Sequence, residues 1–309
     1  SLVLTAAQTV DFTIGTLATL ETLTGSSSND TVTMLSGSFA GMFTTINLGS
    51  GSSDVLNVVA AGDISAATAA TVSNTETGNL IGTSGTDTTT LTGSQLDAIL
   101  IGSGTVNLGS GSGDTINLTS TSSDLNTLGA TDASIQGVEA ISASTAGAGV
   151  TITLSAQSEA FTVTVGSSAD TITAGSGNDT VTANGGADTV NGGSGDDTLY
   201  GNDGADHLYG GSSNDTVNGG NGDDILDGGS NDDTLDGGEG NDYIWGSTGI
   251  DRVTYALATS AISVNLFTGV ATGGYGSDTI LAIENVTGSS YDDTIFSDVA
   301  NNSINGGSG

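Results

Sequence analysis

The sequence contains no cysteine, no proline and only one residue that is either lysine or arginine, and aromatic residues make up 4% of its 309 residues. Without cysteine there can be no disulfide framework. A chain whose only fixed cation is Arg252 cannot bind nucleic acid or an anionic membrane surface through a basic patch. No stretch approaches the roughly 18 consecutive apolar residues that a membrane-spanning helix needs. We therefore expect neither a nucleic-acid partner nor membrane insertion.

Acidic residues and glycine dominate what is present. The chain has 35 Asp and Glu residues, a formal charge of −34, and 50 glycines. A hydrophobic content of 35% with few aromatic residues predicts a thin, elongated core. So many carboxylates must be neutralised by something other than side chains. Two interpretations compete, namely disorder caused by self-repulsion and ordered structure built around metal cations.

A period of nine residues decides between them, because it runs unbroken from Val165 to Thr254. Units such as Gly192–Tyr200 read Gly-Gly-x-Gly-x-Asp-x-U-x, where U is apolar. The sixth place of each unit is aspartate: Asp170, Asp179, Asp188, Asp197, Asp206, Asp215, Asp224, Asp233, Asp242 and Asp251. Two places later comes a branched aliphatic residue: Ile172, Val181, Val190, Leu199, Leu208, Val217, Leu226, Leu235, Ile244 and Val253.

This unit has a physical logic of its own. A three-residue strand x-U-x alternates its side chains, so U points inward and its neighbours point outward. The turn needs backbone conformations with positive φ, which glycine adopts without steric cost. Calcium prefers six to eight oxygen ligands, which a tight turn supplies as carbonyls beside the aspartate. The turn glycines expected at these calcium sites are Gly175, Gly177, Gly192, Gly193, Gly195, Gly201, Gly204, Gly210, Gly211, Gly219, Gly220, Gly222, Gly228, Gly229, Gly237, Gly238 and Gly240.

The repeat resembles the RTX, or haemolysin-type, calcium-binding nonapeptide family. The resemblance implies an all-β fold, a parallel β-roll in which two nonapeptides form one coil and each calcium ion lies between stacked coils. It also implies type I secretion from a Gram-negative cell, with the chain unfolded in a calcium-poor cytoplasm and folded outside. Carried onto this sequence, it places Asp170, Asp188, Asp206, Asp224 and Asp242 in one ladder and Asp179, Asp197, Asp215, Asp233 and Asp251 in another.

Three departures from glycine at the fourth place bear on individual sites. Ser168, Ser213 and Asn231 stand there instead. Asparagine tolerates a left-handed backbone conformation better than serine does. We therefore expect weaker or distorted calcium sites around Ser168 and Ser213.

Three further segments surround the array at 165–254. Residues 1–164 carry a looser repeat of about sixty residues and predict a wider β-solenoid. Residues 255–287 predict a β spacer, and residues 288–309 resume the repeat and stop within a unit. Further aspartates expected to bind calcium are Asp30, Asp54, Asp87, Asp114, Asp278 and Asp293. An end within a unit indicates a fragment or a processed product; alternatively, a second copy completes it head to tail.

The chain lacks the parts of a catalytic site. His207 is the only histidine and takes an outward seventh place, and without cysteine or lysine the common nucleophilic mechanisms lack at least one group. Carboxylate pairs such as Asp196 and Asp197 could in principle hydrolyse glycosides. Similar pairs recur in several turns, so calcium binding explains them better. We expect no enzymatic activity and no cofactor besides Ca²⁺.

Three functional hypotheses follow. The first is an extracellular, calcium-dependent structural protein of the bacterial cell surface, such as a surface layer, matrix or adhesin segment that assembles with copies of itself. The second is the folding and secretion module of a larger secreted enzyme or toxin. The third, a module that binds glycan or ice, needs a flat threonine array, which His207, Ile225 and Tyr243 interrupt.

Overall fold

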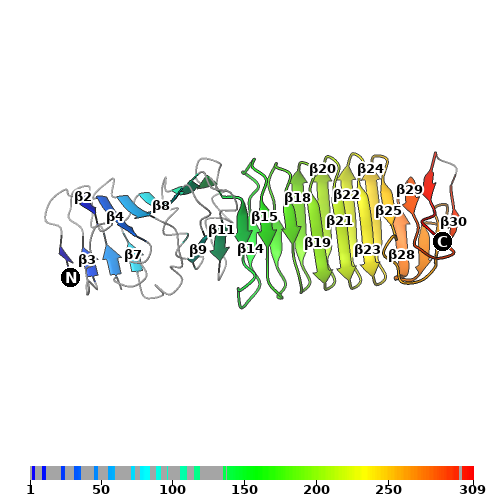
Figure 1. Cartoon of the computed structure of the whole chain (residues 1–309), viewed down its shortest axis with the longest axis horizontal. Coiled ribbons are helices and arrows are strands. Elements are labelled where there is room, and N and C mark those ends of the chain that lie inside the picture. Colours follow the sequence, from blue (N-terminus) through cyan, green and yellow to red (C-terminus); the bar gives the residue numbers. More distant parts are fainter. Residues whose placement is uncertain are drawn as a thin grey trace. The chain divides into compact units, whose positions relative to one another are not determined.

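The computed structural model describes residues 138–298 and 301–309 in full and, before them, only strand residues and Leu96. Two compact units divide the chain, Ser1–Ala146 and Gly147–Gly309. Every element with defined bounds is a β-strand (Figure 1). Within the described residues, no helix is long and apolar enough to cross a bilayer. The predicted fold class, an all-β parallel solenoid, is confirmed.

The first unit contains parallel strands in three sets. Its sheets have the orders β1-β3-β5-β7 and β2-β4-β6-β8-β10-β12, and β11 pairs with β9 on one side and with β13 on the other. Partners lie 22 residues apart at Thr9↔Thr31 and 29 apart at Val106↔Ile135, so each coil is longer than in the nonapeptide array. The strands are β1 (Leu2–Val3), β2 (Thr9–Asp11), β3 (Thr22–Thr24), β4 (Thr31–Leu35), β5 (Thr45–Asn47), β6 (Val55–Val59), β7 (Thr71–Ser73), β8 (Thr77–Thr83), β9 (Thr88–Leu91), β10 (Thr105–Gly109), β11 (Thr115–Leu118), β12 (Ile135–Gln136) and β13 (Ala140–Ser142).

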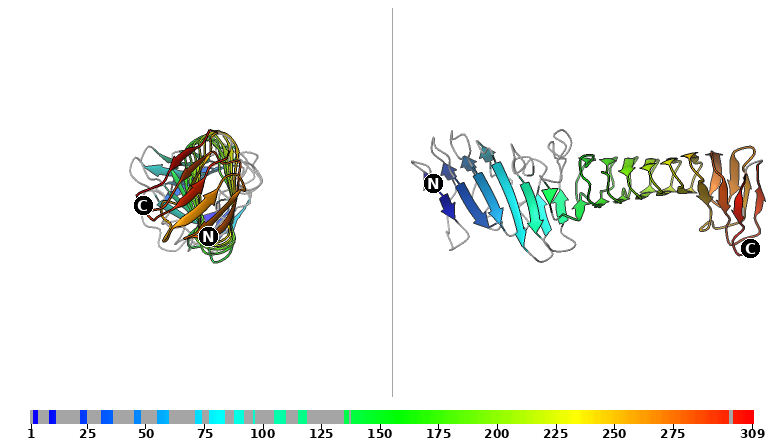
Figure 2. Two further views of the ribbon diagram at one scale, coloured as in Figure 1. Left: turned by 90° about the vertical axis from the view of Figure 1, so that its right-hand side faces the viewer. Right: turned by 90° about the horizontal axis from the view of Figure 1, so that it is seen from above.

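The second unit forms two facing rows of strands that alternate along the chain (Figure 2). One sheet has the order β14-β16-β18-β20-β22-β24-β28-β27-β26-β30, and the other contains β15-β17-β19-β21-β23-β25-β29-β31. The strands are β14 (Thr151–Thr153), β15 (Thr162–Thr164), β16 (Thr171–Thr173), β17 (Thr180–Thr182), β18 (Thr189–Ser194), β19 (Thr198–Asp203), β20 (His207–Ser212), β21 (Thr216–Asn221), β22 (Ile225–Ser230), β23 (Thr234–Glu239), β24 (Tyr243–Thr248), β25 (Arg252–Thr254), β26 (Ile262–Asn265), β27 (Val270–Gly273), β28 (Gly276–Leu281), β29 (Asn285–Thr287), β30 (Thr294–Phe296) and β31 (Ser303–Asn305).

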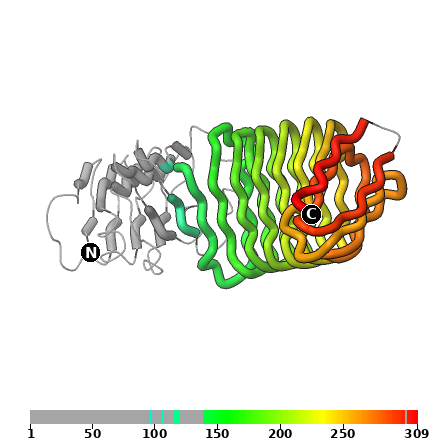
Figure 3. The backbone as a smooth tube through the Cα atoms, turned by 45° about the vertical axis from the view of Figure 1, so that its right-hand side comes forward, coloured from blue at the N-terminus to red at the C-terminus, as the bar shows by residue number. Residues whose placement is uncertain are grey.

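The nine-residue period sets the register of this roll. Parallel partners are 18 residues apart, as in Thr171↔Thr189 and Thr180↔Thr198, so two nonapeptides make one coil (Figure 3). The ten aliphatic residues at the U place are all at most 1% exposed, as predicted. The core is therefore a single file of aliphatic side chains on each sheet. The coils begin before the array, because Thr151 pairs with Thr171 and Thr162 with Thr180.

The predicted spacer interrupts the parallel stacking with a short antiparallel meander. Strands β26, β27 and β28 pair antiparallel in chain order. The chain then returns to both sheets, with Ile280 beside Ile244 and Val286 beside Val253. In the first of these sheets the next parallel strand, β30, stacks on β26, so the three meander strands are inserted between β24 and β30.

Glycine at the fourth place of the unit is required by space as well as by backbone conformation. Gly204 has a φ of +151°, and a Cβ there would overlap the carbonyl oxygen of Gly186 in the preceding coil.

We predict that Gly204→Ala destabilises the calcium-loaded roll by about 3 kcal/mol or more. Gly147→Ala, where a Cβ would meet nothing within 4 Å, is the matched control. Thermal unfolding at saturating Ca²⁺ measures both; equal melting temperatures would contradict the prediction.

Candidate metal centre

The sixth-place aspartates form two continuous ladders, one along each edge of the roll. Each accepts a hydrogen bond at Oδ1 from a backbone N–H one coil earlier. Asp188 N donates to Asp206 Oδ1 at 2.8 Å, and Asp197 N donates to Asp215 Oδ1 at 2.8 Å. The stacking groups the array aspartates as expected, with Asp170 and Asp179 at the first rungs.

The second carboxylate oxygen of nearly every ladder aspartate has no partner. These Oδ2 atoms are buried and accept no hydrogen bond in Asp170, Asp188, Asp197, Asp206, Asp215, Asp224, Asp233, Asp242 and Asp251. Asp179 differs, because its Oδ2 accepts the N–H of Gly175 at 3.1 Å. A buried carboxylate oxygen without a partner carries a large desolvation cost. The ladders are therefore incomplete without an added donor or cation.

Backbone carbonyls lie beside these orphaned oxygens. The position that a Cβ of Gly192 would take is 2.5 Å from Asp197 Oδ2 and 2.6 Å from the carbonyl oxygen of Gly210, one coil later. The same arrangement recurs at Gly210, with Asp215 Oδ2 and the Gly228 carbonyl both at 2.6 Å. The first-place glycine thus keeps open a small space that carboxylate and carbonyl oxygens share. This donor set fits Ca²⁺, a hard cation that binds oxygen ligands.

The corners do not bring three acidic side chains together. Among the residues that the structure describes, no group of three or more His, Cys, Asp or Glu side chains is placed to hold a metal ion. Each rung supplies one carboxylate per ladder, so the other ligands of an ion would be backbone carbonyls of the turn and of the next coil. This explains why the sites depend on glycine as much as on aspartate.

Burial and stacking change the protonation of the ladders. The pKa is raised to about 7 in Asp188, Asp197, Asp215, Asp224, Asp233 and Asp242. Loss of hydration is the main cause, and repulsion from the neighbouring rungs adds to it, as Asp206 and Asp170 do for Asp188. Without a cation the rungs therefore hold their protons near neutral pH. A bound Ca²⁺ ion would supply the positive charge that lets them ionise.

Beyond the array, the aspartates predicted to bind calcium differ in whether they continue a ladder. Asp278 continues the ladder of Asp242, whose N–H donates to Asp278 Oδ1 at 3.1 Å. Asp293 does not stack on either ladder; it accepts hydrogen bonds from the N–H groups of Ile262 and Ser289. The residues after two of the first-half aspartates, Thr31 and Val55, are partners in register. Outside the described residues lie Asp30, Asp54, Asp87 and Asp114 themselves.

Most of the predicted turn glycines at the second and fourth places have positive φ, and Gly175 and Gly177 do not. The second place has positive φ at Gly193, Gly211, Gly220, Gly229 and Gly238, and the fourth at Gly195, Gly204, Gly222 and Gly240. Ser213 and Asn231 also take positive φ at the fourth place, 88° and 81°. Ser213 therefore adopts a left-handed backbone conformation that is unfavourable for serine. The weaker calcium site expected around it remains a prediction.

Two further ladder residues were not expected from the sequence. Glu284 takes the rung after Asp251, accepting its N–H at Oε2 at 2.9 Å. The hydroxyl of Tyr255, which is 2% exposed, donates to Asp278 Oδ2 at 2.8 Å and so gives that oxygen the partner that the array oxygens lack. The only sequence signal for Glu284 is the Asn-Val-Thr that follows it, which matches x-U-x.

Stacked coils with orphaned carboxylates and open carbonyl corners define a calcium-binding parallel β-roll. The family model of the RTX calcium-binding nonapeptide repeat matches residues 164–199, 191–226, 200–235, 218–253 and 283–309. These parts of the chain are RTX repeats, which bind Ca²⁺ and are typical of secreted proteins. No curated protein matches the chain.

Calcium removal tests the ladders directly. We predict that chelation at pH 8 abolishes the β-structure of the roll, because the ionised rungs repel one another. Acidification to pH 5 in chelator should restore part of it. The folded pKa values near 7 lie above the unfolded value of 3.8, so protons bind the folded roll preferentially and stability rises as pH falls. Circular dichroism measures both effects; a spectrum indifferent to Ca²⁺ at pH 8 would disprove the first.

The neighbouring residues Asp223 and Asp224 allow the effect of a ladder carboxylate to be distinguished from the effect of surface charge. Asp224 carries an orphaned Oδ2, whereas Asp223 is exposed and accepts hydrogen bonds from the backbone N–H and the side-chain Nδ2 of Asn241. We predict that Asp224→Asn raises the Ca²⁺ concentration at the folding midpoint several-fold, and that Asp223→Asn moves it little. Calcium titrations followed by circular dichroism measure both midpoints, and equal shifts would assign the effect to net charge.

Proposed function

We propose that this protein is an extracellular, calcium-dependent structural protein of the bacterial surface, secreted by a type I pathway from a Gram-negative cell. The orphaned Oδ2 atoms along both ladders carry the proposal. They make the roll conditional on Ca²⁺, so the chain folds where calcium is plentiful. Extracellular calcium modules bind with dissociation constants of about 0.1–1 mM, which suits such a switch.

A structural role rather than catalysis agrees with the chemistry of the side chains. The chain has one histidine, no cysteine and no lysine. His207 lies at the outward first place of β20, in register with Thr189 and Ile225. Its surroundings in the roll repeat from coil to coil and offer no unique reaction centre. We infer that the protein is not an enzyme.

An exposed apolar cluster on the outer face of β24 and β28 supports assembly with other copies. Tyr243, Trp245 and Leu281 are 41%, 43% and 40% exposed, and Trp245 and Leu281 are partners in register. Val270, also 41% exposed, is the partner of Thr279 on the adjoining strand. Adjacent exposed apolar side chains are typical of interaction surfaces, whereas isolated ones are not.

The alternative is a folding and secretion module of a larger secreted enzyme or toxin. The family match is confined to residues 164–253 and 283–309. This favours the alternative, since these repeats need no function beyond calcium-driven folding. A catalytic domain encoded in the same gene would support the alternative.

Electron microscopy tests the structural role. We predict ordered sheets or fibres in Ca²⁺ and none in chelator, with assembly lost in a Trp245→Ser, Leu281→Ser double variant. Tyr209→Ser is the matched control, because Tyr209 lies in the same outward row two rungs away and is 37% exposed. Folded but dispersed particles at saturating Ca²⁺ would overturn the proposal.

A further inference from the structure

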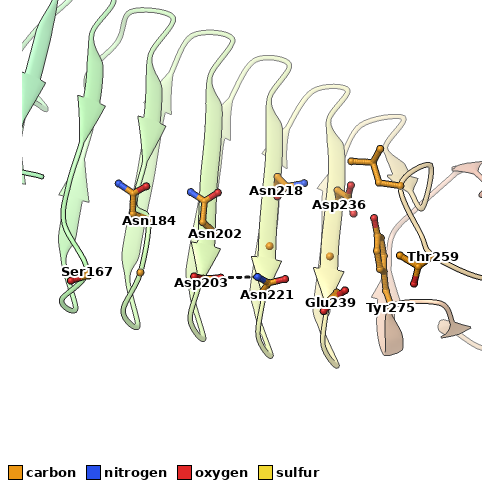
Figure 4. Close-up of a pocket in the computed structure, with 14 residues that line it drawn as sticks. Ser167, Asn184, Asn202, Asp203, Asn218, Asn221, Asp236, Glu239, Thr259 and Tyr275 are labelled. Atoms are coloured by element: carbon orange, nitrogen blue, oxygen red, sulfur yellow. Dashed lines mark hydrogen bonds between the residues drawn. The ribbon is translucent and has the colours of Figure 1, made fainter.

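A polar groove with a volume of about 650 Å³ follows one face of the roll (Figure 4). Successive rungs contribute Asn184, then Asn202 and Asp203, then Asn218 and Asn221, and then Asp236 and Glu239. Neighbouring strands are about 4.8 Å apart, so the groove offers a polar group at each such step. Leu257, Thr259 and Tyr275 of the spacer line its end. A volume of this size is typical of sites for small organic ligands.

Asp236 is a buried carboxylate in this groove with one oxygen that lacks a hydrogen-bond partner. It is only 8% exposed, and its Oδ1 is buried without any hydrogen-bond partner. Its carboxylate does accept the backbone N–H of Gly238. The equivalent Asp227 of the preceding unit is less buried and accepts a hydrogen bond from the Ser247 hydroxyl at 2.7 Å. Asp236 therefore lines the groove with an unsatisfied acceptor and takes no rung of either hydrogen-bonded ladder, and burial together with the charge of the ladder residue Asp278 raises its pKa.

The groove presents oxygens more than donors. Asn184 Nδ2 donates to the carbonyl of Val165 at 2.8 Å, and Asn221 Nδ2 donates to Asp203 Oδ1 at 2.6 Å. These bonds turn amide nitrogens toward the protein and leave the amide oxygens for a ligand. Asp203, Asp236 and Glu239 add negative charge, and none of the lining residues is cationic.

Tyr275 places an aromatic ring beside two of these carboxylates. Tyr275, Asp236 and Glu239 line the same end of the groove (Figure 4), and burial together with the charges of the two carboxylates raises the pKa of Tyr275 to about 12. Carboxylates beside an aromatic ring form the usual environment for an organic cation, which gains charge-assisted hydrogen bonds and a cation–π contact.

We propose that this groove binds an elongated ligand carrying a primary ammonium group, held by Asp236 beside Tyr275, with its body along the asparagine-lined rungs. A linear polyamine and an amino-sugar oligomer share this chemistry. The site is distinct from the calcium corners and requires only that the roll be folded.

Calorimetric titration of the full chain at saturating Ca²⁺ and about 0.15 M salt tests the proposal. The probes are spermidine, a glucosamine tetramer and the fully N-acetylated tetramer, which keeps the sugar and removes the charge. We expect one or both amines to bind and the acetylated tetramer not to bind; which amine binds identifies the source. Asp236→Asn should weaken binding by about 30-fold, because it removes a buried charge partner.

The matched control is Asp227→Asn, which changes the same Leu-Asp-Gly-Gly context on the opposite sheet and should leave the affinity unchanged. Asp236→Asn should also raise the melting temperature of the ligand-free roll, because it removes an unpaired buried charge. A merely structural Asp236 would instead lower that temperature and leave amine binding intact. If this variant fails to fold, Tyr275→Leu decides the question through loss of amine affinity. Equal binding of the acetylated tetramer, or no binding of any probe, overturns the proposal.

Discussion

The roll depends on the ladder aspartates, in which the two oxygens of each carboxylate have different roles. Oδ1 of each ladder aspartate binds the backbone N–H of the preceding coil, as between Asp215 and Asp233 at 2.8 Å, and this bond fixes the stacking. In every array aspartate except Asp179, Oδ2 remains buried and unsatisfied. The same side chain thus builds the coil interface and leaves it incomplete. Coil stacking and cation binding are therefore one event, because the carboxylate cannot enter the interface without losing its hydration.

The thin core makes this dependence strict. Each nonapeptide buries one aliphatic side chain, such as Leu226 or Leu235, which stabilises the fold by about 2 kcal/mol. Ordering the nine residues of a unit costs several times that amount in conformational entropy. Hydrogen bonds between coils reduce the deficit without removing it. A thicker core would hold the carboxylates together without metal, so the slender architecture itself couples folding to calcium.

The sequence predicted those features that follow from a fixed period. Ten units in register specify which side chain points inward, where φ is positive and which aspartates share an edge, because every unit repeats the same local problem. Features created by distant contacts were not predictable. Glu284 occupies a ladder rung although its local sequence lacks the aspartate signature, and Asp236 lines a groove together with the distant spacer residues Leu257 and Tyr275. In the first unit the coils vary from 21 to 29 residues, so no single period could fix their register.

The scarcity of basic residues completes the physical account. A lysine or arginine within reach of a ladder would satisfy Oδ2 from inside the chain, and the roll would then fold without calcium. The single arginine, Arg252, instead donates to the hydroxyl of Thr287 at 3.1 Å. Where the chain holds almost no cations of its own, the negative charge of a buried carboxylate can be balanced only from outside the molecule. In the ladders a divalent metal ion balances this charge, because backbone carbonyls converge on the same corners. Asp236 lies on an open groove beside an aromatic ring, and the same reasoning there favours an organic cation.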